Sequence, residues 1–120
     1  MHHVCVAFPV LPGRSEGARA FMRQLDAERR SEYDQSERRI GITKEAWFLA
    51  ALPSGDHLIG YMESPDFQSA FGQFSTSRHA FDIWFKQEFL QATGFDFEHP
   101  PADMAMPELL SFYQPGTAAL

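Results

Sequence analysis

The sequence predicts an α+β fold in which helices cover one face of a four-stranded antiparallel sheet. Two observations lead to this prediction. Segments with alternating apolar residues stand between segments whose apolar residues recur every three or four positions, and their order is strand, helix, strand, strand, helix, helix, strand. At 120 residues and 44% hydrophobic content, the chain can bury one core. We therefore expect a single domain over residues 1–113 and a frayed tail at 114–120.

The first predicted strand spans residues 3–10, where valine or phenylalanine stands at every second position. A helix is expected from Ser15, with an apolar stripe that ends at Leu25 and a charged extension beyond it. Gly41 is typical of the residue just past a last helical turn. We interpret the charged extension as a solvated surface held by ion pairs.

A hairpin is predicted next, from a mostly apolar strand at residues 44–52 and a strand at 56–63. The loop between them, residues 53–55, is Pro-Ser-Gly. A three-residue loop that ends in glycine suits a type I turn followed by a left-handed residue. This loop would pair Leu52 with Asp56 and so fixes the expected register of the whole hairpin.

Two helices are predicted in the second half of the chain, on either side of a break at residues 75–77. The second of them, residues 78–90, is the densest aromatic segment of the sequence, and we interpret its stripe as core packing. Asp82 and Lys86 lie four apart on this helix and are expected to pair on its surface. Residues 109–113 are predicted to form the last strand.

This order of elements is the split β-α-β form of the ferredoxin-like fold. Helices on one face would cover the apolar side of the first strand, but the strand at 44–52 is apolar on both sides. No residues remain to form another layer over the second face. We therefore expect a homodimer, a dimeric α/β barrel in which the sheets of two copies face each other.

Several motifs also carry a resemblance to a known family. They are CVAFPVLPG at 5–13, EAWFL at 45–49, GDHLIGYME at 55–63 and AFDIWFK at 80–86. With them the chain resembles, nearly to Tyr113, an uncharacterised bacterial domain of unknown function, DUF6176, in the dimeric α/β-barrel (ferredoxin-like) superfamily. That superfamily includes cofactor-independent monooxygenases, haem-linked members and amino-acid-sensing domains. The resemblance thus implies a fold and a dimer, and no particular reaction.

The amino-acid composition excludes some classes of binding partner. A formal charge of −6 without a lysine cluster argues against nucleic acid and against an anionic membrane surface. The first residues lack the basic start and apolar run of a signal peptide, and no apolar stretch approaches 18 residues, so we expect a cytoplasmic protein. The single cysteine, Cys5, can form no internal disulfide. We interpret it as a buried small side chain in preference to a reactive thiol.

The predicted hairpin register yields the main candidate site. It places Glu45 opposite Glu63 and Trp47 opposite Tyr61 on one sheet face, with His57 nearby. Two opposed carboxylates beside aromatic rings repel each other, so that one would be held neutral and could act as a general acid or base. The alternative is that both glutamates lie at a wet sheet end or pair with an arginine such as Arg39.

Two further candidates lie around the aromatic helix. His79, near Asp82, could be an oriented base, and the alternative is that it caps the start of the helix. Trp84 is expected to close one end of the pocket, mainly by packing. The five histidines offer no paired ligand spacing, so neither a metal nor a cofactor is expected.

We therefore expect the chain to bind or transform a small hydrophobic or aromatic metabolite, in a monooxygenase-like or isomerase-like reaction without a metal. Glu45, Glu63 and His79 are the catalytic candidates. The substrate-binding candidates are Trp47, Tyr61, His57, Arg39 and Trp84. The alternative function is a non-catalytic ligand-binding or stabilising dimeric module, which would need Trp47 and Tyr61 but no carboxyl group with a shifted pKa.

Overall fold

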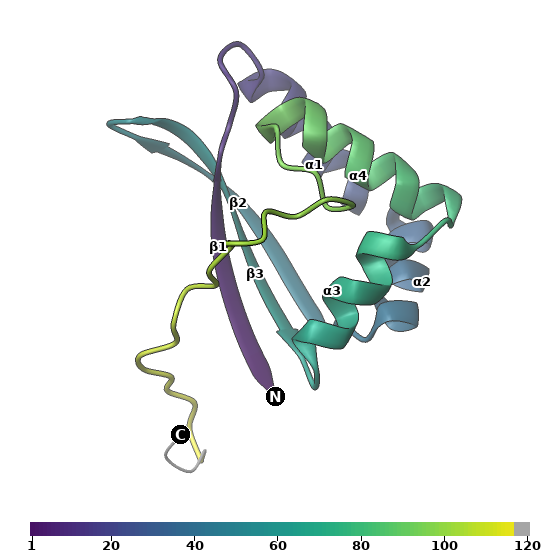
Figure 1. Ribbon diagram of the computed structural model, residues 1–120, viewed down its shortest axis with the longest axis vertical. Helices are drawn as coiled ribbons and strands as arrows, with labels where there is room; N and C mark the ends of the chain where they lie inside the picture. Colours follow the sequence, from purple (N-terminus) through teal and green to yellow (C-terminus); the bar gives the residue numbers. More distant parts are fainter. Residues whose placement is uncertain (117–120) are drawn as a thin grey trace.

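The computed structural model describes residues 1–116 and shows three strands and four helices (Figure 1). All four helices lie on one face of the sheet. The strands are β1 (His2–Pro9), β2 (Lys44–Leu52) and β3 (Gly55–Ser64), and the helices are α1 (Ser15–Asp26), α2 (Arg30–Ile40), α3 (Phe67–Thr76) and α4 (Ala80–Thr93). The sheet is antiparallel in the order β1-β3-β2. The α+β class is consistent with the sequence prediction.

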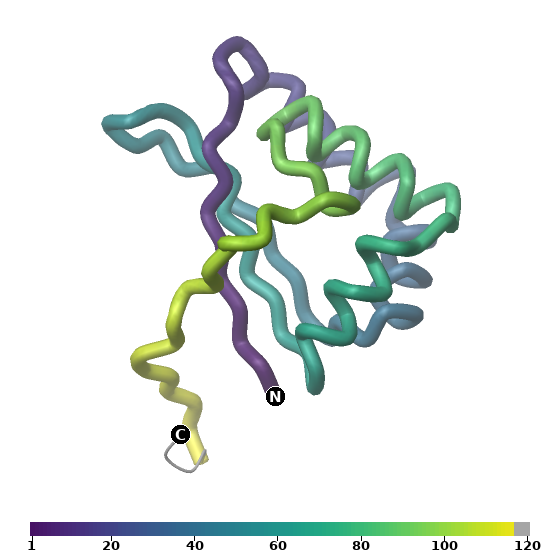
Figure 2. Tube along the Cα trace, in the orientation of Figure 1, coloured from purple at the N-terminus to yellow at the C-terminus, as the bar shows by residue number. Residues whose placement is uncertain are grey.

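The predicted four-stranded ferredoxin-like sheet is wrong, and with it the barrel built from two such sheets. Residues 109–113 pair with no strand and instead run past the β1 edge as an irregular segment (Figure 2). Leu110 and Tyr113 in this segment are each 84% exposed. The run buries too little apolar surface to offset the entropy of ordering a strand. Its one strong contact is Phe112, whose ring stacks on His3 with centroids 4.2 Å apart.

The long charged helix of the prediction is two helices. Α turn at residues 27–29 separates α1 from α2, and the backbone N–H of Arg29 donates to the carbonyl of Gln24 there. The turn brings one side of α2 onto the sheet, so the segment is not simply a solvated surface. Gly41 ends α2 in the left-handed conformation, with φ of 90°, as its position in the sequence predicted.

The hairpin register differs from the prediction by one residue. Its loop has two residues, Pro53 and Ser54, because Gly55 already pairs with Leu52. A slip of one residue moves every side chain of one strand to the other face relative to its partner. In the observed register Glu45 pairs with Met62, and Lys44 is the residue opposite Glu63.

The core lies between the helices and the face of the sheet that they cover. Phe8 from β1 and Phe21 from α1 meet α4 there, at Phe85 and at Phe89, which has no exposed surface. The rings contact one another mostly edge to face, the arrangement that aromatic quadrupoles favour. The interpretation of the aromatic stripe as packing is confirmed for these rings.

The predicted surface pair of Asp82 and Lys86 is wrong, because both side chains are buried and each bonds elsewhere. Asp82 accepts hydrogen bonds from Ser36, Arg39 and Ser77. Lys86 donates to the carbonyls of three residues at the end of α3, namely Phe74, Ser75 and Ser77. These two charged side chains therefore fasten α4 to α2 and to the α3–α4 turn.

Candidate functional site

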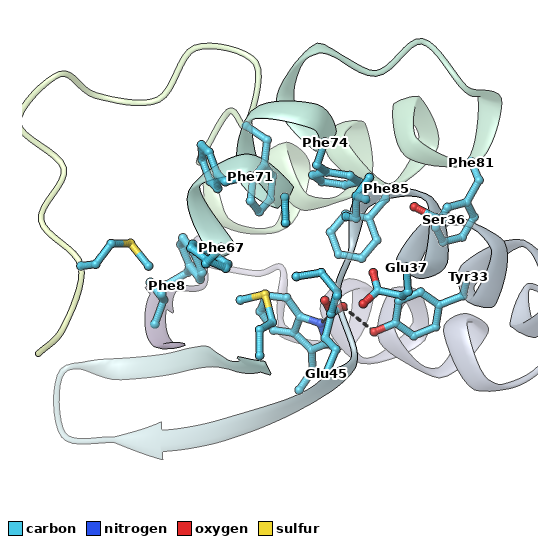
Figure 3. Close-up of a pocket in the computed structure, with 18 of the residues that line it drawn as sticks. Phe8, Tyr33, Ser36, Glu37, Glu45, Phe67, Phe71, Phe74, Phe81 and Phe85 are labelled. Carbon is cyan, nitrogen blue, oxygen red and sulfur yellow. Dashed lines mark hydrogen bonds between the residues drawn. The ribbon is translucent and has the colours of Figure 1, made fainter. Parts of the chain in front are cut away.

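A cavity lies between the covered face of the sheet and helices α2, α3 and α4 (Figure 3). Its room for the centres of water molecules is about 50 Å³, enough for a few waters. Apolar side chains form nearly all of the wall, and phenylalanines from α3 and α4 dominate it: Phe67, Phe71, Phe74, Phe81 and Phe85.

Three polar side chains meet at one end of the cavity: Tyr33 and Glu37 from α2, and Glu45 from β2. Tyr33 and Glu37 are one helical turn apart, so both point from α2 toward the sheet. The Tyr33 hydroxyl donates to Oε2 of Glu45, and the Trp47 Nε1–H donates to the same oxygen over 2.9 Å. Glu45 is thereby held in one orientation by two donors.

The position of Trp47 depends on a glycine across the sheet. Gly60 is its partner in the β2–β3 register, and the indole lies across it. A Cβ atom at position 60 would lie 2.7 Å from two carbons of the indole ring, closer than real contacts allow. The absence of a side chain at Gly60 thus lets Trp47 lie flat on the sheet and reach Glu45.

Burial raises the pKa values of both carboxyl groups. It raises the pKa of Glu37 to about 10, and the nearby charges of Glu45 and Asp82 act in the same direction. Burial also raises the pKa of Glu45, against the hydrogen bonds that Tyr33, Trp47 and Glu37 make to it. The pair therefore keeps at least one proton at neutral pH, held between Glu37 and Glu45.

Two details complete the polar end of the cavity. The pKa of Tyr33 is raised by burial and by the charge of Glu45, so its hydroxyl remains a donor. Oε2 of Glu37 is buried without a hydrogen-bond partner among the described residues. A buried polar atom without a partner is costly, and a bound molecule with a donor group could satisfy it.

Glu63 and Tyr61 lie on the opposite face of the sheet, which the helices leave open. The Tyr61 hydroxyl donates to Glu63 over 2.6 Å and lies 3.1 Å from Nδ1 of His3. The hydrogen bond from Tyr61 lowers the pKa of Glu63, and it raises the pKa of Tyr61 to about 12. The predicted pairings of Glu45 with Glu63 and of Trp47 with Tyr61 are therefore wrong.

Two other predicted residues also belong to the open face. His57 lies near the hairpin turn, where its Nδ1 is 2.9 Å from the carbonyl oxygen of Gly55. Cys5 is exposed there, so its interpretation as a buried side chain is wrong. The sheet alternation places Cys5 on the side away from Val4 and Val6, which is the face that the four helices do not cover.

Arg39, His79 and Trp84 lie outside the lining of the cavity. Arg39 pairs with Asp82 over 2.8 Å, so it neutralises neither Glu45 nor Glu63. His79 is the exposed N-cap residue of α4 but makes no capping hydrogen bond with its side chain. Asp82 accepts its hydrogen bonds from Ser36, Arg39 and Ser77, so it does not orient His79.

Trp84 packs against the core but does not close the cavity as predicted, because it lies outside the cavity lining. Its ring meets the edge of Phe21, and the guanidinium of Arg29 lies 4.0 Å from its centroid. The helix that carries Trp84 does contribute to the cavity, but through Phe81 and Phe85.

The sequence interpretation missed Tyr33 and Glu37. Their signal was present as a helical stripe of Tyr33, Ser36, Glu37 and Ile40, spaced by three and four residues within the charged segment. The surrounding arginines and acids concealed this stripe, because it mixes polar with apolar residues. All four members line the cavity.

Among residues 1–116, no helix is both long and apolar enough to cross a membrane. No curated protein and no solved structure is significantly similar to the chain. A family model, described as a family of unknown function (DUF6176), matches residues 1–110. Since this match covers almost the whole chain, the protein belongs to the family DUF6176.

Proposed function

We propose that the cavity binds a small hydrophobic or aromatic molecule and that Glu37 and Glu45 exchange a proton with it. The observation that carries this proposal is a proton-holding carboxyl pair at the end of an otherwise apolar cavity. A carboxyl group that stays protonated at neutral pH can donate its proton to a ligand, and the resulting carboxylate can take a proton back.

The reaction class that these residues support is an isomerase-like proton transfer. Apolar side chains form most of the cavity wall, which strengthens hydrogen bonds inside the cavity and leaves the carboxyl pair as its main proton carrier. Tyr33 and Trp47 hold Glu45 in place as donors. No cavity residue has an evident role in oxygen transfer, so the monooxygenase-like alternative has less support.

The second candidate is a non-catalytic binding module. Oε2 of Glu37, which has no hydrogen-bond partner within residues 1–116, favours it, because that atom could anchor a donor group of a ligand without any transfer of a proton. The two candidates share the cavity and differ in whether the proton of the pair moves during turnover.

The experiment has two parts. Carbon-13 NMR of the side-chain carboxyl groups should show Glu37 titrating far above its usual range, and ordinary pKa values at both Glu37 and Glu45 would sink the proposal. Cyclohexanone in deuterated water then serves as the probe for proton transfer. Wild type should speed exchange of its α-protons, Glu45→Gln should not, and the matched surface variant Glu63→Gln should behave as wild type. Saturable binding without exchange would select the binding module.

We also propose that the protein is a cytoplasmic homodimer. The open face supports the dimer, because two large apolar side chains of β2 are exposed on it: Phe48 is 58% exposed and Leu52 is 45% exposed. Exposed large apolar side chains on a sheet face favour burial against another surface. Light scattering at micromolar concentration tests this, and a monomer there would contradict it.

A further inference from the structure

A second hollow lies at the β1 edge, outside the cavity. It is bounded by the first residues of β1, the start of α3 and the segment Pro100–Leu109, and its room for water centres is about 660 Å³. Four side chains line both this hollow and the cavity: Phe67, Phe71, Met104 and Met106. The two spaces therefore adjoin each other at these four residues.

The segment that supplies the two methionines is weakly fastened. Within the described chain, residues 100–113 make no hydrogen bond to the sheet or the helices, and the bond from the Met104 N–H to the Pro101 carbonyl is local. The segment is held by side-chain packing, including the stacking of Phe112 on His3. Few backbone hydrogen bonds mean a low cost of local opening, and unbranched methionines change rotamer easily.

We propose that the cavity and the β1-edge hollow are two halves of one channel for an elongated apolar ligand whose head group donates hydrogen bonds, such as a medium-chain amine or alcohol. This proposal rests on the proposed function for its inner half. Movement of Met104 and Met106 joins the two halves. The head group reaches Glu37 and Glu45, and the apolar chain extends past Phe67 and Phe71 to the β1 edge.

The size of the two spaces supports an elongated ligand. The inner cavity alone has room for the centres of only a few water molecules, about 50 Å³, whereas the outer and more open hollow has about 660 Å³. The outer hollow also contains His2, His3 and Gln68, so that end of a ligand can meet polar groups and water.

The chemistry of the inner end selects the head group. Oε2 of Glu37 has no hydrogen-bond partner among the described residues, and no cation lines the cavity. Arg30, Arg38 and Lys44 share with Glu37 and Glu45 only a separate, more open hollow. An ammonium or hydroxyl group supplies the missing donor, and an ammonium also balances a buried negative charge. A carboxylate head would add a third acid group to the two already there and is disfavoured.

The test compares decylamine, 1-decanol and decanoate, which share one chain length, with butylamine, all below their micelle concentrations on the full chain. We expect calorimetry to show the amine and the alcohol binding at least tenfold more tightly than decanoate. Decylamine should bind more tightly than butylamine, by up to roughly four-fold for each methylene that becomes buried. Glu37→Gln should weaken decylamine at least tenfold and leave the chain-length dependence in place.

The position of the bound alkyl chain is tested separately, by NMR contacts from decylamine to the methyl groups of Met104 and Met106. The double variant Met104→Ala/Met106→Ala should speed association of decylamine, while Leu110→Ala, on the same segment but 84% exposed and outside both linings, should not. Butylamine bound at Glu37 with no gain for decylamine would overturn the channel and leave the proposed function standing. Ordinary carboxyl pKa values would instead remove the proposed function itself.

Discussion

The two faces of the sheet carry the same pair of residue types in opposite surroundings. On the covered face Tyr33 donates to Glu45, and on the open face Tyr61 donates to Glu63. Burial dominates at Glu45 and raises its pKa, whereas the tyrosine hydrogen bond dominates at Glu63 and lowers its pKa. The comparison teaches that exposure to water, and not the tyrosine–glutamate pair itself, decides which carboxyl group keeps a proton.

The largest expected contrast concerns packing on the two faces. Phe89→Ala removes a ring with no exposed surface from contact with Phe8, Trp47 and Phe85, and should cost about 3–5 kcal/mol of unfolding free energy. Phe48→Ala, on the open face, should change the stability of the single chain by about 0.5 kcal/mol or less. Urea unfolding measures both, and similar losses in a monomer would show that the open face is buried by something else.

The pH dependence should separate the two carboxyl groups next. Burial raises the pKa of Glu37 from its ordinary value of 4.5 to about 10 in the folded state. At any pH between these two values, the folded chain therefore binds more protons than the unfolded chain. The unfolding free energy should therefore fall as pH rises from 5 to 9, by up to about 1.4 kcal/mol per pH unit. Glu37→Gln should flatten this slope.

For Glu63 we expect the opposite dependence of the unfolding free energy on pH. Its lowered pKa gives stability that is present above its unfolded pKa and is lost as pH falls through the lower folded value. Glu63→Gln should therefore change only the acid limb and leave the slope between pH 5 and 9 as in wild type. A wild-type slope equal to that of Glu37→Gln would show that no proton is held on the covered face.

A smaller effect is expected at the glycine that seats Trp47. Gly60→Ala places a Cβ against the indole and should cost about 1–3 kcal/mol, with a shift of the Trp47 indole N–H resonance. Gly72→Ala in α3 is the matched control, because nothing lies within 4 Å of its added Cβ. Alanine there should stabilise the helix by roughly 0.5–1 kcal/mol. An unchanged indole resonance in Gly60→Ala would contradict the proposed seating.

A contrast of similar size is expected between the two tyrosines. Tyr33→Phe removes one of the donors to a buried carboxyl group and should cost about 1–3 kcal/mol. Tyr61→Phe should leave stability nearly unchanged and let the pKa of Glu63 rise toward its ordinary value. Carboxyl carbon-13 titrations read out both effects. Equal losses of stability in Tyr33→Phe and Tyr61→Phe would show that water is excluded equally from the two faces.

The sequence placed Glu45 beside Trp47 correctly, but it gave Glu45 the wrong carboxyl partner. Glu45 and Trp47 do lie together in an aromatic surrounding, and the carboxyl group does have a raised pKa. Its carboxyl partner is Glu37 of α2, not Glu63. The turn at residues 27–29 that redirects α2 contains neither glycine nor proline, so only the mixed polar and apolar stripe of α2 indicated that this helix packs on the sheet.

Local sequence alone determined the features whose causes are local. Alternation in β1 placed Val4, Val6 and Phe8 on one face, the aromatic spacing of α4 made it a core helix, and Gly41 and Gly94 marked helix ends. Only the tertiary structure decided the hairpin register, the path of residues 109–113 and the pairing of Glu37 with Glu45. Each of these depends on a small difference between competing long-range packings: a loop of two or three residues, an edge paired or left open, and one helix or two.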